Sequence, residues 1–311
     1  MSGIVKRADL RGLVDLEGPG IARGEPMSRH TTFRIGGPAD LFVEAASADN
    51  LRDIVLTARQ QHVRYFVLGG GSNILVSDAG IRGLVILNKA REIEFGTLKV
   101  ECESGVVLPT LARECIERGL AGLEWAIGVP GTVGGAVVGN AGAHGSDVAH
   151  SLVSASILDS DGNVRDWSAQ ELQFGYRSSV LKSAIRHPTS DLPPAVLAAE
   201  FELKRSTREE CEARAAECTE KRKRTQPPGA TIGSMFKNPP SDYAGRLIEA
   251  AGLKGARAGN AEISNIHANF FVNLGGASAA DIYSLINLAR EKVQAMFGIE
   301  LELEIQLVGE W

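Results

Sequence analysis

The chain has 311 residues, of which 44% are hydrophobic and 23% charged. This composition is ordinary for a globular protein with a buried core and excludes wholesale disorder, and the length suits two or three lobes. The formal net charge of −5 disfavours a dedicated nucleic-acid-binding protein. With no run of 18 apolar residues, no membrane span is predicted. The N-terminal 18 residues are charged throughout, so no secretory signal is expected.

The four cysteines, Cys102, Cys115, Cys211 and Cys218, form no C-x-x-C pair. A zinc ribbon and a thioredoxin-type motif are therefore not indicated, and no metal site is predicted. Free thiols in a reducing cytoplasm are the simplest interpretation.

The first half of the chain alternates helix and strand patterns. Ser47 precedes an apolar repeat that predicts a capped helix over 48–62. A second helical repeat covers 108–119 and ends at Gly119. Apolar runs predict strands at 63–68, 83–88 and 97–103. The glycine-rich stretch 128–145 is predicted to be rich in loop.

The second half begins with a predicted hairpin, because strand-like runs at 152–158 and 164–167 flank the turn sequence 159–163. A strand is predicted over 195–204. Ser206 and Glu209 then fit a capping box for a highly charged helix ending near Arg224, which should lie on the surface between lobes.

Two further elements are predicted near the C-terminus. A helix over 278–297 has an apolar face made by Ile282, Leu285, Ile286, Ala289, Val293, Met296 and Phe297. The segment 301–307 alternates apolar and polar residues, which predicts a strand with one buried face.

Glycine is in excess, with 35 residues, and groups of glycines lie at 69–71, 128–145 and 252–259. The first group follows a predicted strand and is continued by Ser72 and Asn73, so its backbone N–H groups could bind an anion such as a pyrophosphate; a plain tight turn is an equally good interpretation. Position 74 is Ile, which excludes G-x-G-x-x-G, and no P-loop lysine follows. The 128–145 stretch could pack against a flat cofactor or against backbone, and its His144 alone indicates little.

Three polar features complete the candidates. Ser234, in the segment 233–239, could donate a proton, although an ordinary loop serine is favoured on sequence alone and no hydrolase elbow is present. Arg177 and Glu304 are interpreted as surface charges. The basic run 221–224 could meet phosphates or could be a solvated helix end.

Taken together, the motifs resemble those of the UDP-N-acetylenolpyruvoylglucosamine reductase (UDP-N-acetylmuramate dehydrogenase) family. Each is weak alone, but their order along residues 30–309 is highly specific. The matching segments are 30–37 (HTTFRIGG), 68–76, 128–145, Tyr176-Arg177, 233–239 (GSMFKNP), Ser264 with 267–273, and the Leu-Glu-x-Glu sequence at 301–304. Leu303 stands where this family usually has proline and Asn260 where a second glycine is common, but neither departure removes a catalytic group.

The resemblance implies an α+β protein with an FAD-binding domain of the vanillyl-alcohol-oxidase (PCMH) type and a smaller C-terminal α+β substrate lobe. The implied division is an N-terminal segment 1–33, the FAD domain 34–205, a linker helix 206–220 and the substrate domain 221–311. The short spacing between Arg177 and Ser234 favours the shorter subtype, without an extra tyrosine-bearing loop. The resemblance further implies a cytoplasmic enzyme of peptidoglycan synthesis, serving cell wall biogenesis, cell shape, cell cycle and division, as a monomer or weak dimer.

The same resemblance implies the contacts of bound FAD and of a sugar-nucleotide substrate. The FAD contacts would be Arg34, Gly69, Gly70, Gly71, Ser72, Asn73, Gly128, Pro130, Gly131, Gly134, Gly135, Asn140 and Gly142. The substrate contacts would be Tyr176, Lys237, Asn238, His267 and Asn269.

The implied chemistry is reduction of an enolpyruvyl ether by NADPH through the flavin. A hydride would pass from flavin N5 to C3, and C2 would receive a proton from Ser234. Arg177 would lie against the carboxylate and stabilise the developing charge, with Glu304 helping to polarise it. Two alternatives remain open on the sequence: a flavin-dependent oxidase on the same fold, and a nucleotide-binding module without catalysis.

Overall fold

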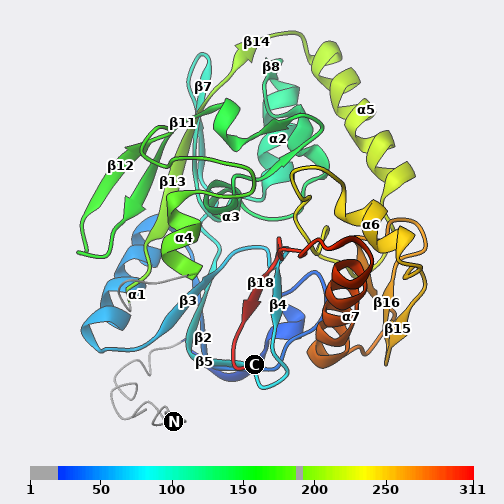
Figure 1. Ribbon diagram of the computed structural model, residues 1–311. Helices are drawn as coiled ribbons and strands as arrows, with labels where there is room; N and C mark the ends of the chain where they lie inside the picture. The colour runs from blue at the N-terminus through cyan, green and yellow to red at the C-terminus, as the bar shows by residue number, and fades with distance from the viewer. Residues whose placement is uncertain (1–19, 187–191) are drawn as a thin grey trace.

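The computed structural model describes residues 20–186 and 192–311, and the first 19 residues of the expected N-terminal segment lie outside this range. The fold is α+β, as predicted, and Figure 1 shows an antiparallel sheet (upper left), a mixed sheet below it and a C-terminal lobe to the right. No helix in the described ranges has the length and apolar character needed to cross a bilayer.

The mixed sheet has the strand order β1-β2-β5-β3. Its strands are β1 (Ala22–Pro26), β2 (Pro38–Ala45), β5 (Ile81–Asn88) and β3 (Tyr65–Leu68), with β2, β5 and β3 parallel to one another. Helix α1 (Ala48–Gln60) packs on it, and the Ser47 hydroxyl accepts a hydrogen bond from the Asn50 N–H, which confirms the predicted cap. The helix ends two residues before the predicted limit because His62 takes the left-handed conformation, φ +55°.

The antiparallel sheet has the order β12-β11-β13-β7-β6. Its strands are β12 (Val164–Ser168), β11 (Leu152–Leu158), β13 (Ala195–Glu202), β7 (Lys99–Glu103) and β6 (Ile93–Phe95). The predicted β11–β12 hairpin is confirmed, and the Asp159 carboxylate closes its turn by accepting hydrogen bonds from the N–H groups of Asp161 and Asn163, both at 2.9 Å.

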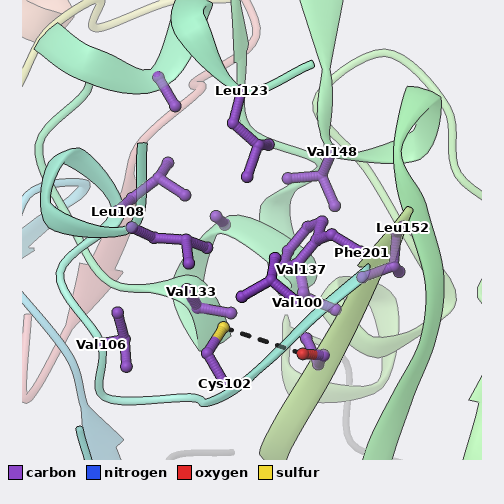
Figure 2. Packing of buried hydrophobic residues seen from close by; sticks show 14 of the residues in the cluster. Val100, Cys102, Val106, Leu108, Leu123, Val133, Val137, Val148, Leu152 and Phe201 are labelled. Carbon is purple, nitrogen blue, oxygen red and sulfur yellow. Dashed lines mark hydrogen bonds between the residues drawn. The ribbon is translucent and has the colours of Figure 1, made fainter. Parts of the chain in front are cut away.

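The core of this half lies between the antiparallel sheet and two helices, α2 (Leu108–Glu117) and α3 (Val133–Gly139). Figure 2 shows Val133 and Val137 of α3 pointing at Val100 and Phe201 of the sheet. The Cys102 thiol donates to the Ala199 carbonyl at 3.8 Å, and burial raises the pKa of this thiol. All four cysteines are free, as predicted.

The stretch 128–145 is rich in loop, as predicted, but it also contains helix α3, which the sequence did not predict. Glycine disfavours a helix, but Val133, Ala136 and Val137 bury their side chains in the core and outweigh that cost. Asn140 ends the helix in the left-handed conformation, φ +43°. The short pair β9 (Gly142–Ala143) and β10 (Ser146–Asp147) follows.

Helix α5 (Arg208–Thr225) leads from the first half to the C-terminal lobe. Its capping box is formed by Thr207 and Glu210, so the predicted pair Ser206–Glu209 is one residue too early. The remaining short elements are α4 (Val180–Arg186), the pair β8 (Leu120–Ala121) with β14 (Lys204–Arg205), and the 3-10 helices η2 (Met27–Arg29), η3 (Glu124–Gly128) and η4 (Val148–His150).

The C-terminal lobe packs α6 (Ala244–Ala250) and α7 (Ala279–Phe297) against the small sheet β15-β16-β17. Its strands are β15 (Arg257–Ala258), β16 (Ala261–Ile263) and β17 (Phe271–Asn273). The predicted apolar face of α7 is confirmed from Ile282 to Val293, but Met296 and Phe297 are exposed, because the buried cluster ends at Val293 and the helix continues for one more turn.

The last strand is shorter than predicted. Only β18 (Gln306–Val308) is regular, and it runs parallel to β4 (Ile74–Val76), the strand that follows the first glycine group (Figure 1). Residues 304–305 form a bend that interrupts the strand, but the predicted buried face is confirmed, because Leu301, Leu303, Ile305 and Leu307 all pack into the core of the C-terminal lobe. Phe33, Ile35 and Leu75 also pack into the core of the C-terminal lobe, so the two halves interlock.

Glu124 joins η3 to α5 and provides a test of this packing. Its carboxylate accepts from the Gly122 N–H at 2.7 Å and lies 2.7 Å from Nε of Arg214, with only 10% of the side chain exposed. Burial opposes ionisation, but the backbone hydrogen bonds and Arg214 outweigh it and hold the pKa of Glu124 below its ordinary value. A glutamate in the unfolded chain has a pKa of about 4.3, so the stabilising effect of Glu124 is complete above that pH. The effect is lost as the pH falls through the lower pKa of the folded protein.

We expect Glu124→Gln to lower the free energy of unfolding at pH 7 by about 1–3 kcal/mol, measured by urea denaturation, with the deficit shrinking below pH about 4. Glu114→Gln is the matched control, because Glu114 pairs with Arg118 in an exposed position and should change stability by less than about 1 kcal/mol. Equal losses at the two sites, or a deficit that grows on acidification, would contradict this account.

Candidate active site

A cavity of about 520 Å³ lies where the glycine-rich segments meet the C-terminal lobe. Its walls come from β3 and the loop 69–73, from the 129–144 stretch, from the end of α5, and from the surroundings of Ser234 and Glu304. Arg177 also lines it. The structure therefore brings together the three residues with implied catalytic roles and most of the implied FAD contacts.

The two glycine groups pack directly on each other. A methyl group on Gly70 would lie 2.9 Å from Cα of Gly131, and the Ser72 hydroxyl donates to the Pro130 carbonyl at 3.0 Å. Gly70 and Gly131 therefore serve close backbone packing. Both glycines also line the cavity, so close backbone packing and cofactor binding are compatible roles for the same residues.

The cavity fits FAD in size and chemistry. A volume of 520 Å³ is within the range of cofactor sites. A methyl group on Gly139 or Gly233 would meet no atom within 4 Å, so these glycines leave room for a flat ring system. Gly69 to Asn73 would hold the pyrophosphate through backbone N–H groups, and Pro130, Gly131, Gly134, Gly135 and Gly142 would lie against the rest of the molecule.

Backbone hydrogen bonds place Glu304 beside the Ser234 segment and the glycine loop. The Glu304 N–H donates to the Met235 carbonyl at 2.9 Å, and the Asn73 amide donates to the Glu304 carbonyl at 3.3 Å. The Gln306 N–H then donates to the Asn73 carbonyl at 3.0 Å. Three segments far apart in sequence are thus held at one point of the cavity wall.

Arg177 and Glu304 form an ion pair in this wall. Nε of Arg177 lies 2.9 Å from Oε1 of Glu304, with 28% and 12% of the side chains exposed. The N–H at Nε is not aligned for a hydrogen bond to any described residue, so the contact is mainly Coulombic. This ion pair holds the Arg177 side chain in the cavity wall.

The protonation of Glu304 reflects two opposing effects. Burial raises the pKa of this carboxyl group, and the positive charges of Arg177, Lys182 and Lys237 counteract the rise without cancelling it. Burial also lowers the pKa of Arg222, assisted by nearby Arg177, and lowers the pKa of His144, assisted by Lys221 and Arg222.

Cations dominate the ionisable groups of the cavity, although the whole chain is acidic. Among the described residues that line it, the basic side chains are Arg177, Lys182, Lys221 and Arg222, and the acidic one is Glu304. Such an excess of positive charge attracts anionic ligands such as diphosphates and carboxylates. The phosphate interpretation of the 221–224 run thus gains support at Lys221 and Arg222.

Three of the implied FAD residues lie outside the cavity lining. Arg34 is exposed with φ +56°, and Gly128 packs against the Arg222 side chain. Asn140 is buried, and its amide donates to the Gly175 carbonyl at 3.0 Å. Their direct contact with FAD remains a prediction.

The implied substrate residues also lie outside the lining, on its C-terminal side. The Asn269 amide donates to the Phe236 carbonyl at 2.8 Å and accepts from the N–H of the same residue, so it braces the Ser234 segment. Lys237 pairs with Glu302 at 2.5 Å. The carbonyl oxygen of the Asn238 amide accepts from the Ala244 N–H at 3.1 Å.

The other two implied substrate residues, His267 and Tyr176, differ in exposure. The ring nitrogen Nδ1 of His267 accepts from the Asn269 N–H at 3.2 Å, and burial lowers the pKa of this imidazole. Tyr176 is 60% exposed, and its hydroxyl lies 3.5 Å from the Asn238 N–H. Substrate contact by these five residues stays a prediction.

Sequence reasoning missed several residues of the lining, notably Lys182, Thr132, Gly139 and Gln306. A signal existed for Lys182, a lysine five residues after Arg177 in a segment of small and apolar side chains. Gln306 offered no signal, because its place follows from the pairing of β18 with β4.

The fold and the cavity define an FAD-dependent oxidoreductase. The profile described as "FAD binding domain" matches residues 39–168, and the profile described as "UDP-N-acetylenolpyruvoylglucosamine reductase, C-terminal domain" matches residues 225–308. The chain is 44% identical over 288 residues to the UDP-N-acetylenolpyruvoylglucosamine reductase of Chloroflexus aurantiacus, covering 91% of this chain and 96% of the relative. It is 45% identical to that of Rubrobacter xylanophilus, covering 92% and 94%.

The chain therefore belongs to the UDP-N-acetylenolpyruvoylglucosamine reductase family. The crystal structure of the Thermus caldophilus reductase superposes with a TM-score of 0.77 at 37% identity, covering 91% of this chain and 97% of that one. The N-terminal half accordingly has the FAD-binding fold implied by the resemblance. Within the described ranges, no group of three His, Cys, Asp or Glu side chains could hold a metal ion.

Gly139 provides a direct test of the FAD site. We expect Gly139→Leu to reduce bound FAD at least tenfold while leaving folding intact, because Gly139 lines the cavity and a Cβ atom built on it meets no atom within 4 Å. Flavin content and FAD affinity, measured by flavin fluorescence, report the change, and circular dichroism checks the fold. Gly139→Ala is the matched control with a small effect. Full flavin occupancy in Gly139→Leu would place FAD elsewhere.

Proposed function

We propose that the chain reduces the enolpyruvyl ether of UDP-N-acetylglucosamine to UDP-N-acetylmuramate for peptidoglycan synthesis, with NADPH as the electron donor. The observation that carries the proposal is that Arg177, Ser234 and Glu304 line one cavity together with the glycine loop suited to FAD. The names of the relatives supply the substrate, and the cationic lining suits an anionic sugar nucleotide.

FAD, when bound, supplies the hydride that C3 of the ether accepts. Negative charge then develops on C2 and the adjoining carboxylate, where Arg177 stabilises it. Arg177 suits this role because its ion pair with Glu304 holds the guanidinium at the wall before substrate enters. The enzyme then needs no reorganisation as charge develops.

Ser234 donates the proton to C2. A serine hydroxyl is a weak acid, but the enolate-like carbon is a strong base, so a positioned hydroxyl suffices. Its position is set by backbone contacts: an antiparallel bridge joins Ser234 to Phe270, and Asn269 braces Phe236. Gly233 precedes it with φ +86°, a conformation that favours glycine.

Glu304 is protonated during the substrate step in this proposal. An entering carboxylate competes for Arg177, and a second negative charge nearby raises the pKa of Glu304 beyond the rise caused by burial. The protonated carboxyl can then donate a hydrogen bond to the substrate carboxylate.

The proposal also includes the use of the cavity, the cellular location, the domain borders and the oligomeric state. NADPH and the sugar nucleotide would use the cavity in turn, with Lys221 or Arg222 near a diphosphate. The four free thiols favour a cytoplasmic location. We further propose domain borders at 34–205 and 221–311, the shorter subtype, and a monomer or weak dimer; α5 runs unbroken across residue 220.

We expect Ser234→Ala to leave the reduction of flavin by NADPH within about twofold of wild type and to slow reduction of the enolpyruvyl substrate by about 10²–10⁴-fold. Stopped-flow absorbance separates the two half-reactions. Ser284→Ala, which removes an exposed hydroxyl on α7, is the control. Equal loss in both half-reactions would contradict the proton-donor role, and rapid O₂ consumption without the enolpyruvyl substrate would favour an oxidase.

The pH profile tests Glu304. In wild type the substrate half-reaction should weaken as pH rises through the raised pKa, since the protonated form is lost. Glu304→Gln keeps a neutral hydrogen-bond donor, so we expect a rate about 10–100-fold lower but without that alkaline limb. Rates between pH 5 and 9 decide this, and an unchanged limb in Glu304→Gln would assign it to another group.

A further inference from the structure

Arg177 has an unusual backbone conformation. It is the third residue of the four-residue turn 175–178, whose ends, Gly175 and Ser178, exchange hydrogen bonds at 3.0 and 3.2 Å. Its φ is +53°, a value that glycine or asparagine usually supplies at this position. An arginine there is strained, and such strain persists only when neighbouring groups hold it.

One of the groups that hold the turn is Lys182, on α4. Its ammonium Nζ donates to the Arg177 carbonyl at 2.8 Å. On the other side, the Asn140 amide donates to the Gly175 carbonyl at 3.0 Å. The Gly175 and Arg177 carbonyls are therefore each bound by a side chain from outside the turn.

Hydrogen bonds also fix the first turn of α4, and they therefore fix the backbone position of Lys182. The buried Ser179 hydroxyl donates to the Val138 carbonyl of α3 at 2.6 Å and accepts from the Lys182 N–H at 3.2 Å. Because α3 lines the cavity, the ammonium group is positioned relative to the cofactor site.

Lys182 also belongs to the charged surroundings of the Arg177–Glu304 pair. It lines the cavity with both residues, and its positive charge lowers the pKa of the Glu304 carboxyl. The cations that act on Glu304 are Arg177, Lys182 and Lys237. Loss of Lys182 would thus affect both the conformation of residue 177 and the charge balance at the cavity wall.

We infer that Lys182 is a positioning residue for the substrate step: its ammonium–carbonyl hydrogen bond keeps Arg177 in the left-handed conformation that aims the guanidinium at Glu304 and the cavity. The inference rests on the proposed function for its kinetic consequences only. The geometric claim concerns Arg177 alone and is tested without turnover.

The experiment compares Lys182→Met with Lys182→Arg in the flavin-loaded full-length protein. Methionine keeps the length but removes the donor, whereas arginine retains donors and charge. We expect Lys182→Met to lower kcat of the enolpyruvyl reduction about 10–100-fold with a smaller change in KM, and Lys182→Arg to recover most of the loss. Flavin content and flavin reduction by NADPH should fall less than enolpyruvyl reduction does, because the hydrogen bond that is lost holds Arg177. Lys99→Met, which removes a solvent-exposed contact to Glu200, is the matched control and should match wild type.

Two further measurements make the outcome decisive. In an Arg177→Met background, Lys182→Met should add less than a twofold loss of kcat, because the lysine acts through that arginine. Crystal structures should show residue 177 leaving the left-handed region in Lys182→Met and keeping it in Lys182→Arg. Unchanged φ and kcat in Lys182→Met, or fully additive losses in the double variant, would overturn the inference. If wild-type protein fails to reduce the enolpyruvyl substrate, the proposed function fails, and the crystal structures still decide the role of Lys182.

Discussion

The site depends on a set of backbone and amide hydrogen bonds around Glu304. Its N–H is bound to the segment that carries Ser234, and its carbonyl is bound by Asn73 of the glycine loop. The parallel pairing of β18 with β4 then continues this contact for three residues. Because each partner belongs to a different part of the chain, the reacting groups and the cofactor loop can share one wall only in the fully folded protein.

The basic side chains of the cavity lining favour anionic ligands. The chain carries a net charge of −5, yet the ionisable side chains of the described cavity lining are mostly basic. This contrast concentrates anions at the site rather than over the whole surface. Burial of Glu304 opposes its ionisation, and the surrounding cations limit the effect. A carboxyl group whose pKa is raised by burial, beside an arginine, fits a reaction in which negative charge develops next to a carboxylate.

Local signals in the sequence predicted most of the elements. Ser47 marked the start of α1, and the apolar repeat located α7. Local signals failed where tertiary contacts decide the backbone conformation. Helix α3 forms in a glycine-rich stretch because Val133 and Val137 are buried, and a bend at 304–305 limits the last strand to 306–308 although its apolar face is buried as predicted. Two overlapping capping boxes, at 206 and 207, could not be distinguished without the structure. The grouping of Arg177 with Glu304 came from the family resemblance, because no spacing rule links residues so distant in sequence.

The central claim is that one cavity holds the flavin ring, Ser234, Arg177 and Glu304 around the same double bond. A crystal structure with FAD and the enolpyruvyl sugar nucleotide tests it most directly. The account predicts the Ser234 hydroxyl about 3–3.5 Å from C2, on the face opposite the ring, with the guanidinium and carboxyl groups on the substrate carboxylate. An enolpyruvyl group bound beyond the reach of residue 234, or turned away from residues 177 and 304, would contradict it.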